Sequence, residues 1–254
     1  MNKISIVTAT YNADKFLSNL IESIKVQGDV QFEFIIIDGG SKDKTISIIK
    51  QNEEVITKWI SEKDNGIYDA WNKGIALATG NWIMFLGADD MLLPQALAKY
   101  YKFINEHDTN NLELISSKKQ MIDTNGKLIR TTGFRWEWPL FLKYMTIAHP
   151  GALHSTRLFK KYGIFDIKYK ICGDYELLLR AKDKLVTAFF DEVTVKMSEG
   201  GASDSIKAIN EYYRVTTTTG GLSKFKGSGF WLLTLTKYIT KKFLRKLGVN
   251  AYLK

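Results

Sequence analysis

Two adjacent carboxylates, Asp89 and Asp90, directly follow an apolar run that ends at Leu86. Carboxylates held side by side at the end of a buried strand repel each other, and a divalent cation bridged to phosphate oxygens relieves that repulsion. The pair therefore indicates a Mg²⁺ or Mn²⁺ site for a phosphorylated ligand. Taken alone, it is an equally good start for the helix in which Pro94 occupies the first turn.

Asp38 ends a second apolar run and precedes Gly39 and Gly40. Glycines at that point let a ligand approach the backbone, and a carboxylate there can accept an N–H from a base or a hydroxyl from a ribose. Tyr11 follows the first apolar run, where its ring is suited to stack on a nucleobase. Each residue also has a structural interpretation: Asp38 as an Asx-turn and Tyr11 as an aromatic plug of a strand end.

Strands and helices that alternate along the chain are expected to position these residues. Apolar runs at 4–7, 32–37, 58–61 and 82–86 predict strands, and helical spacing predicts helices near 14–27, 41–52, 68–78 and 94–105. Such alternation is typical of a mostly parallel α/β sheet with helices on both faces, which binds ligands beyond the carboxyl ends of its strands. Tyr11, Asp38 and the Asp89–Asp90 pair are therefore expected to converge.

The second half has a different pattern. Asn125-Gly126 predicts a hairpin between 112–122 and 127–132, followed by a helix near 174–182, a strand over 186–197 and a helix near 203–217. We expect residues 1–111 to form a nucleotide-binding half. Residues 112–223 are expected to form a second half of the same globular domain, and 224–254 a basic amphipathic tail.

Charge is concentrated in that tail. The chain has 36 basic and 27 acidic residues, but residues 224–254 hold eight basic residues and no acid, so the body is nearly neutral. A neutral body argues against nucleic-acid binding. The tail fits a helix lying on an anionic membrane, and a helix packed on the body is the alternative. Its predicted apolar side carries Trp231, Leu232, Leu235, Ile239, Phe243 and Leu247.

The single cysteine, Cys172, excludes an internal disulfide and a cysteine zinc cluster, which favours a reducing, cytoplasmic compartment. No apolar run reaches the ~18 residues that a membrane span needs. We therefore expect a cytoplasmic protein that is peripheral on the inner face of the cytoplasmic membrane. The sequence leaves the oligomeric state open.

Several motifs together resemble those of the family 2 glycosyltransferases. They occur in order at 5–12, 34–45, 66–75, 86–90, 149–154 and 172–180. The resemblance implies the GT-A fold and an inverting transfer of a sugar from a nucleotide-sugar, UDP-linked in our expectation, to a hydroxyl. It is closest in pattern to transferases of bacterial envelope polysaccharides, such as O-antigen, capsule or colanic acid, with a glycan or lipid-linked glycan as acceptor.

The resemblance also implies roles for individual residues. Asp174 is expected to be the general base, and Asp90, with Asp89, to bind Mn²⁺ or Mg²⁺. Three departures from the commonest motifs stand out: Gly39 where many members have a second Asp after Asp38, Ala88 where a strict D-x-D has its first acid, and Gly173 where Glu usually precedes the base. The expected nucleotide-sugar contacts are Thr10, Tyr11, Asp38, Asp64, Asp69 and Asp89, and the expected acceptor contacts are His149, Trp136 and Trp138.

Two other function classes stay open at this point. A sugar-nucleotidyltransferase also has an α/β sheet with paired acids, but it is expected to carry a glycine-rich basic loop after its first strand. Residues 10–14 (Thr-Tyr-Asn-Ala-Asp) lack such a loop. The other alternative is a non-catalytic protein that binds nucleotide-sugars or a membrane surface.

Overall fold

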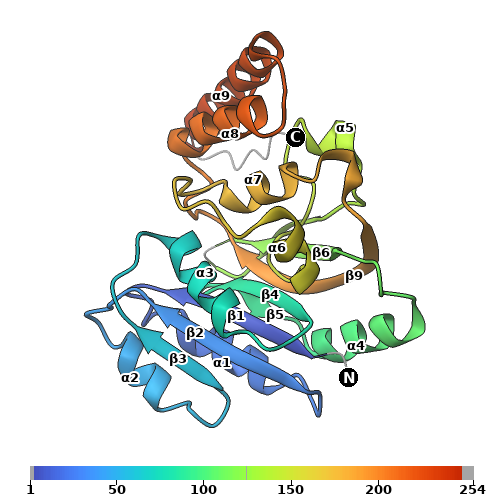
Figure 1. The fold of residues 1–254 in the computed structure, drawn as a ribbon. Helices are drawn as coiled ribbons and strands as arrows, with labels where there is room; N and C mark the ends of the chain where they lie inside the picture. The colour runs from blue at the N-terminus through green and yellow to red at the C-terminus, as the bar shows by residue number, and fades with distance from the viewer. Residues whose placement is uncertain (1–2, 124, 248–254) are drawn as a thin grey trace.

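The computed structural model describes residues 3–123 and 125–247. In this part of the chain, nine strands form one sheet in the order β3-β2-β1-β4-β8-β6-β9-β5, with β7 paired to β6 (Figure 1). The strands are β1 Ile4–Thr10, β2 Phe32–Asp38, β3 Lys58–Ser61, β4 Trp82–Gly87, β5 Met91–Leu92, β6 Leu114–Ile122, β7 Leu128–Thr132, β8 Leu153–Ser155 and β9 Thr187–Ser198.

The first half confirms the predicted α/β alternation. Strands β3, β2, β1 and β4 run parallel, and they are joined by α1 Leu17–Lys25, α2 Thr45–Lys50 and α3 Ile67–Leu77, with α4 Ala96–Glu106 after β5. Helix α2 begins at Thr45, several residues later than predicted, because Asp43 accepts the Thr45 N–H and hydroxyl and holds the preceding segment in a turn.

Each face of the sheet is covered by helices. Side chains alternate along β1, so Ile4 and Ile6 pack under α1 and α4, whereas Val7 packs under α3 and α7. The strands are therefore apolar on both faces, which explains their nearly unbroken apolar runs. At β2 and β4, the carboxylates that were expected to take part in chemistry stand at or just after the carboxyl ends of the strands.

The second half extends the same sheet in a mixed pattern. The β6–β7 hairpin is present as predicted, β8 runs antiparallel to both β4 and β6, and β6 pairs in parallel with β9. Its helices are α5 Trp138–Phe141, α6 Thr156–Tyr162, α7 Gly173–Leu179 and the short 3₁₀ helix Lys182–Lys184. Because β8 joins β4 to β6, the two halves share one continuous sheet and one cleft.

Helices α8 Ile206–Thr218 and α9 Lys224–Lys246 pack together at the end of the molecule opposite the N-terminus (Figure 1). The predicted tail is thus a long helix over its described part, while residues 248–254 lie outside the described residues. No helix in the described ranges combines the length and apolar character needed to cross a membrane.

Candidate active site

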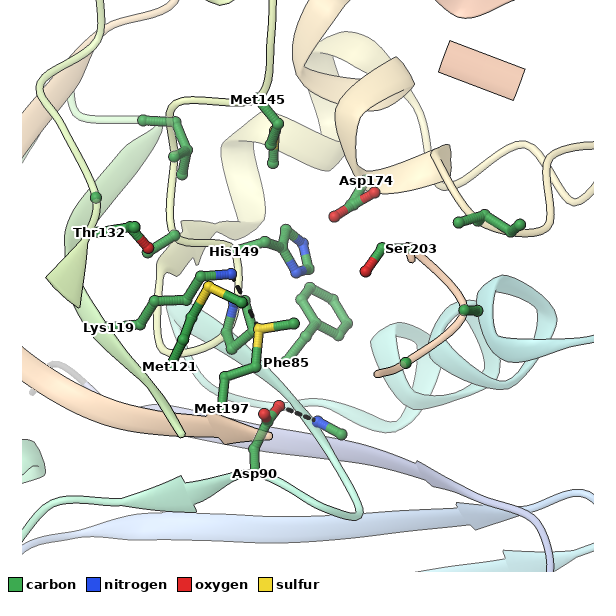
Figure 2. A pocket seen from close by; sticks show the side chains of 18 of the residues that line it. Phe85, Asp90, Lys119, Met121, Thr132, Met145, His149, Asp174, Met197 and Ser203 are labelled. Carbon is green, nitrogen blue, oxygen red and sulfur yellow. Dashed lines mark hydrogen bonds between the residues drawn. The ribbon is translucent and has the colours of Figure 1, made fainter. Parts of the chain in front are cut away.

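A cavity of about 550 Å³ opens beside the carboxyl end of β4 and is walled by β6, β7, β9 and the start of α7. Asp89, Asp90, His149 and Asp174 all line it, although they are as many as 85 positions apart in the sequence. Figure 2 shows Asp90 at one side of this cavity and Asp174 across it. The structure therefore brings together the predicted acidic pair and the predicted base.

The acidic pair is crowded over Gly87. Asp90 is buried and its Oδ2 accepts the Gly87 N–H at 2.7 Å, whereas Asp89 is exposed at the cavity rim. A Cβ on Gly87 would lie 2.8 Å from Asp89 Oδ1 and 3.2 Å from Asp90 Oδ2, so only glycine lets both carboxylates approach this point. Burial and the neighbouring Asp89 charge raise the pKa of Asp90 to about 7.

A bound cation would suit this carboxylate pair, because it would offset both the burial and the mutual repulsion that raise the Asp90 pKa. In the described part of the chain, no group of three or more His, Cys, Asp or Glu side chains is placed to hold a metal ion. Asp89 and Asp90 would therefore supply only part of a coordination shell, and ligand oxygens and water would complete it.

Asp174 stands at the start of α7 and is held by Tyr68 of α3. The Tyr68 hydroxyl donates to Asp174 Oδ1 at 3.0 Å and also contacts the Ile171 carbonyl oxygen at 2.7 Å. Tyr68 is itself buried between Trp71 and Phe165, so its position is fixed by packing. Burial raises the pKa of Asp174, while the Tyr68 hydrogen bond lowers it.

The structure explains why position 173 holds glycine where the commonest motif has glutamate. A Cβ at this position would lie 2.7–2.9 Å from three carbons of the Tyr68 ring, closer than side-chain atoms pack. Because Gly173 has no side chain, the Tyr68 ring can pack against it and donate its hydrogen bond to Asp174. The sequence pattern does not indicate this role for Tyr68.

His149 lies on the cavity floor in an aromatic stack. Its ring packs on Trp71 with centroids 5.2 Å apart and on Phe85 at 5.7 Å. Burial, with a smaller effect of the Lys119 charge, lowers the pKa of His149 to about 3, so the ring is neutral near pH 7. Its Nε2 is buried and has no hydrogen-bond partner among the described residues.

Asp38 and Thr10 do not face a ligand as expected. The Asp38 carboxylate is fully buried, and Thr10, Gly40, Ser41 and Ser61 donate five hydrogen bonds to it. A carboxylate has about four lone-pair sites, so the protein already occupies them. Against the opposing effect of burial, these bonds lower the pKa of Asp38, and they hold the turn after β2, which gives Asp38 and Thr10 a supporting role in that turn.

Asp64, unlike Asp38, lies beside the exposed Tyr11 side chain. A Cβ on Gly39 would meet Asp64 Oδ2 at 2.5 Å and the Tyr11 ring at 3.4 Å, so the three residues adjoin. Asp64 Oδ1 accepts the Gly66 N–H at 2.8 Å, and the Tyr11 ring is 65% exposed, as a stacking platform requires. Asp69 instead accepts the Asn65 N–H at 2.8 Å in the first turn of α3, which is a capping contact.

Trp136 and Trp138 do not line the cavity. Trp136 packs on Phe141 with centroids 4.3 Å apart, and both tryptophans pack against the buried core under α5 and α7. Both side chains are half-buried against the core, so their described contacts are with the protein and not with the cavity. Phe134 and Tyr144 are the exposed aromatic residues at the cavity wall.

The wall opposite Asp174 contains residues that sequence analysis missed. Lys119 and Met121 of β6, Thr132 of β7 and Met197 of β9 are labelled in Figure 2. Arg130 of β7 lines the same wall. Gly201, Ala202 and Ser203, in the loop before α8, form part of the rim. This loop is tied to α9, because Asp204 accepts from Lys241 at 2.6 Å and Glu199 pairs with Arg245.

Comparison with known proteins decides the family. The model of the family described as "Glycosyl transferase family 2" matches residues 5–163, more than half of the chain. The chain belongs to glycosyltransferase family 2. A similar relative is a "PGL/p-HBAD biosynthesis glycosyltransferase" of Mycobacterium bovis, 32% identical over 215 residues, which cover 80% of this chain and 79% of that protein. This family 2 chain is therefore a glycosyltransferase.

Solved structures confirm the GT-A fold of this family 2 transferase. S. aureus TarS in complex with UDP-GlcNAc matches with a TM-score of 0.67 at 18% identity, over 94% of this chain and 73% of the other. A mannosyltransferase of Pyrobaculum calidifontis, in complex with GDP-Man and Mn²⁺, matches with a TM-score of 0.61 at 14% identity, over 93% and 75%.

Proposed function

We propose that this glycosyltransferase moves a sugar, with inversion, from a UDP-sugar to a hydroxyl of a glycan or lipid-linked glycan acceptor. The observation that supports it best is the placement of Asp174 and the Asp89–Asp90 pair in one cavity. The sugar-nucleotidyltransferase and the non-catalytic binder are set aside, because the chain is a family 2 glycosyltransferase.

Asp174 would act as the general base. One of its oxygens accepts from Tyr68, and the carboxylate keeps lone pairs for the acceptor hydroxyl. As that hydroxyl attacks the anomeric carbon, its proton passes to Asp174, a new C–O bond forms, and the bond to the diphosphate breaks on the opposite face. Burial raises the pKa of Asp174, which makes its carboxylate a stronger base toward the acceptor hydroxyl.

The donor would lie along the carboxyl edge of the sheet. Tyr11 would stack on the uracil and Asp64 Oδ2 would accept its ring N–H, in place of the enclosed Asp38. Asp90, with Asp89, would hold the Mn²⁺ or Mg²⁺ that neutralises charge on the leaving diphosphate. The neighbour that binds GDP-Man with Mn²⁺ and the one that binds UDP-GlcNAc support this arrangement by analogy.

UDP binding in the presence and absence of Mn²⁺ tests the donor assignment. We expect Mn²⁺ to increase UDP affinity at least about tenfold, because metal bridging adds roughly 1.4 kcal/mol or more. Asp90→Asn should abolish most of that increase and Asp64→Asn should weaken UDP with and without metal, both measured by calorimetry. Asp69→Asn, a change at a capping carboxylate, is the control; equal UDP affinity with and without Mn²⁺ would refute the metal proposal.

The acceptor would be reached at a membrane surface through α9. Helix α9 turns one face to the body, where the predicted apolar residues Trp231 and Leu235 are half-buried and Trp231 donates to Asn210 at 2.9 Å. The opposite face is apolar and exposed, with Phe225 90% and Phe243 60% exposed. The exposed stripe consists of Phe225, Leu232, Ile239, Phe243 and Leu247.

Exposed lysines border this stripe on both sides, Lys224 and Lys246 on one and Lys226 and Lys237 on the other. An apolar face between basic flanks matches a helix that lies in the interface of an anionic membrane. We therefore propose a peripheral enzyme at the inner face of the cytoplasmic membrane, acting in envelope polysaccharide assembly. The opposite face of the helix packs on the body. Membrane binding and packing on the body, the two alternatives predicted for the tail, would then belong to opposite faces of one helix.

Vesicle binding tests this surface. We expect the wild-type protein to co-sediment with vesicles that contain phosphatidylglycerol and to be released by salt. The triple variant Leu232→Ser, Ile239→Ser, Phe243→Ser should lose most of this binding, because each side chain would bury apolar area worth about 25 cal/mol per Å². The matched control changes three exposed apolar residues elsewhere, Leu128, Ile164 and Val186, to serine. Equal binding by both triple variants would refute the proposal.

A further inference from the structure

Two cations share one wall of the cavity and have unusual partners. The Lys119 ammonium of β6 lies 3.0 Å from Met197 Sδ, and Arg130 Nε of β7 lies 3.3 Å from Met121 Sδ. A thioether sulfur is only a weak acceptor. Among the described residues, neither cation has a carboxylate within ion-pair distance, although Asp90 and Asp174 line the same cavity.

This arrangement differs from that of the other cations near it. Lys118, the neighbour of Lys119 in β6, pairs with Asp191, and Lys241 of α9 pairs with Asp204 at 2.6 Å. Lys119 is half-buried, yet unlike these two lysines it has no carboxylate in direct ion-pair contact among the described residues. Two neighbouring cations that no anion contacts directly are costly, so this wall is suited to bind an anionic group.

The position of the wall indicates which substrate carries that anion. The nucleoside contacts proposed above belong to the ends of β1 and β3, whereas Lys119 and Arg130 lie beyond β4 and β8 in the sheet order. Arg130, Met121 and Met197 also line a second hollow that continues from the cavity to Lys241 of α9. The wall thus faces Asp174 across the cavity and continues toward the helix proposed to bind the membrane.

We propose that Lys119 and Arg130 form an anion subsite for the acceptor, which holds a phosphate or carboxylate group of the acceptor while its hydroxyl faces Asp174. The inference rests on the proposed function, because it places the acceptor between the base and this wall. The methionines give the subsite apolar, adaptable sides, suited to an acceptor that joins an anionic group to a less polar part. Acidic acceptors are then favoured over neutral ones.

The test uses small anions on protein saturated with UDP and Mn²⁺, so that the donor diphosphate is already bound. Glucose 1-phosphate and glucuronate are the anionic probes, and methyl glucoside is the neutral one. We expect the wild type to bind at least one anionic probe about tenfold or more tightly than methyl glucoside. The double variant Lys119→Met, Arg130→Gln should lose that preference and keep its UDP affinity.

Lys118→Met, which removes the neighbouring cation of the same strand, is the matched control and should behave as wild type. Preference for glucose 1-phosphate or for glucuronate identifies phosphate or carboxylate as the favoured group. If the double variant instead weakens UDP but not uridine, the cations serve the donor diphosphate and the inference is overturned. It is also overturned if the wild type shows no preference for the anions. A wild type that fails to bind UDP would contradict the proposed function instead.

Discussion

Replacing Asp174 with asparagine is expected to lower the rate of sugar transfer about 10²–10⁴-fold, the usual contribution of a positioned general base. The amide has the shape of the carboxylate and can keep a hydrogen bond to Tyr68, but it cannot take up a proton at neutral pH. UDP affinity should stay unchanged, because Asp174 stands across the cavity from the acidic pair. Initial rates and calorimetry on the same preparations measure both quantities.

The pH dependence of the wild type provides an independent readout. The base must be ionised, so the rate should fall as the pH drops through the Asp174 pKa, which burial raises above its ordinary value. Tyr68→Phe removes a hydrogen bond that lowers this pKa, so it should move the acid limb of the profile to higher pH. An Asp174→Asn enzyme with near wild-type rates, or a profile that Tyr68→Phe leaves in place, would contradict the assignment.

The parallel half of the fold is predictable from local patterns. Unbroken apolar runs indicate β1, β2 and β4, and the helical spacing between Leu17 and Lys25 indicates α1, since both depend on neighbours within a few positions. The insertion of β8 between β4 and β6 is not predictable in this way. That strand has only three residues, and its partners are 38 to 73 positions away in the sequence.

The role of a site residue can be predicted where a sequence motif alone indicates it. It cannot be predicted where residues that are distant in the sequence determine the role. Asp38 ends a strand as expected, but Ser61, 23 positions later, helps to enclose its carboxylate. Lys119 follows Lys118 in β6, and irregular pairing with β9 on both sides of Lys118 sets which lysine faces the cavity. Strand alternation alone would give no basis for that choice.

Gly173→Glu, which restores the commonest family motif, is expected to inactivate this enzyme. The new Cβ would lie 2.7 Å from the nearest carbon of the Tyr68 ring, and Trp71 and Phe165 prevent the ring from moving away. Overpacking of this kind typically costs about 1–3 kcal/mol of folding stability. Displacement of Tyr68 would also break its hydrogen bond to Asp174, so the transfer rate should fall together with the melting temperature.

Gly173→Ala separates the steric effect from the added charge, because alanine supplies the clashing Cβ alone. We expect it to lower both the melting temperature and the transfer rate, whereas the same change at Gly201, where a Cβ would meet nothing within 4 Å, should leave stability unchanged. Adding Tyr68→Leu to Gly173→Ala should recover stability but not activity, because leucine relieves the clash without supplying the hydroxyl that holds Asp174. Wild-type behaviour of Gly173→Ala would show that contact with Tyr68 does not determine the residue at this position.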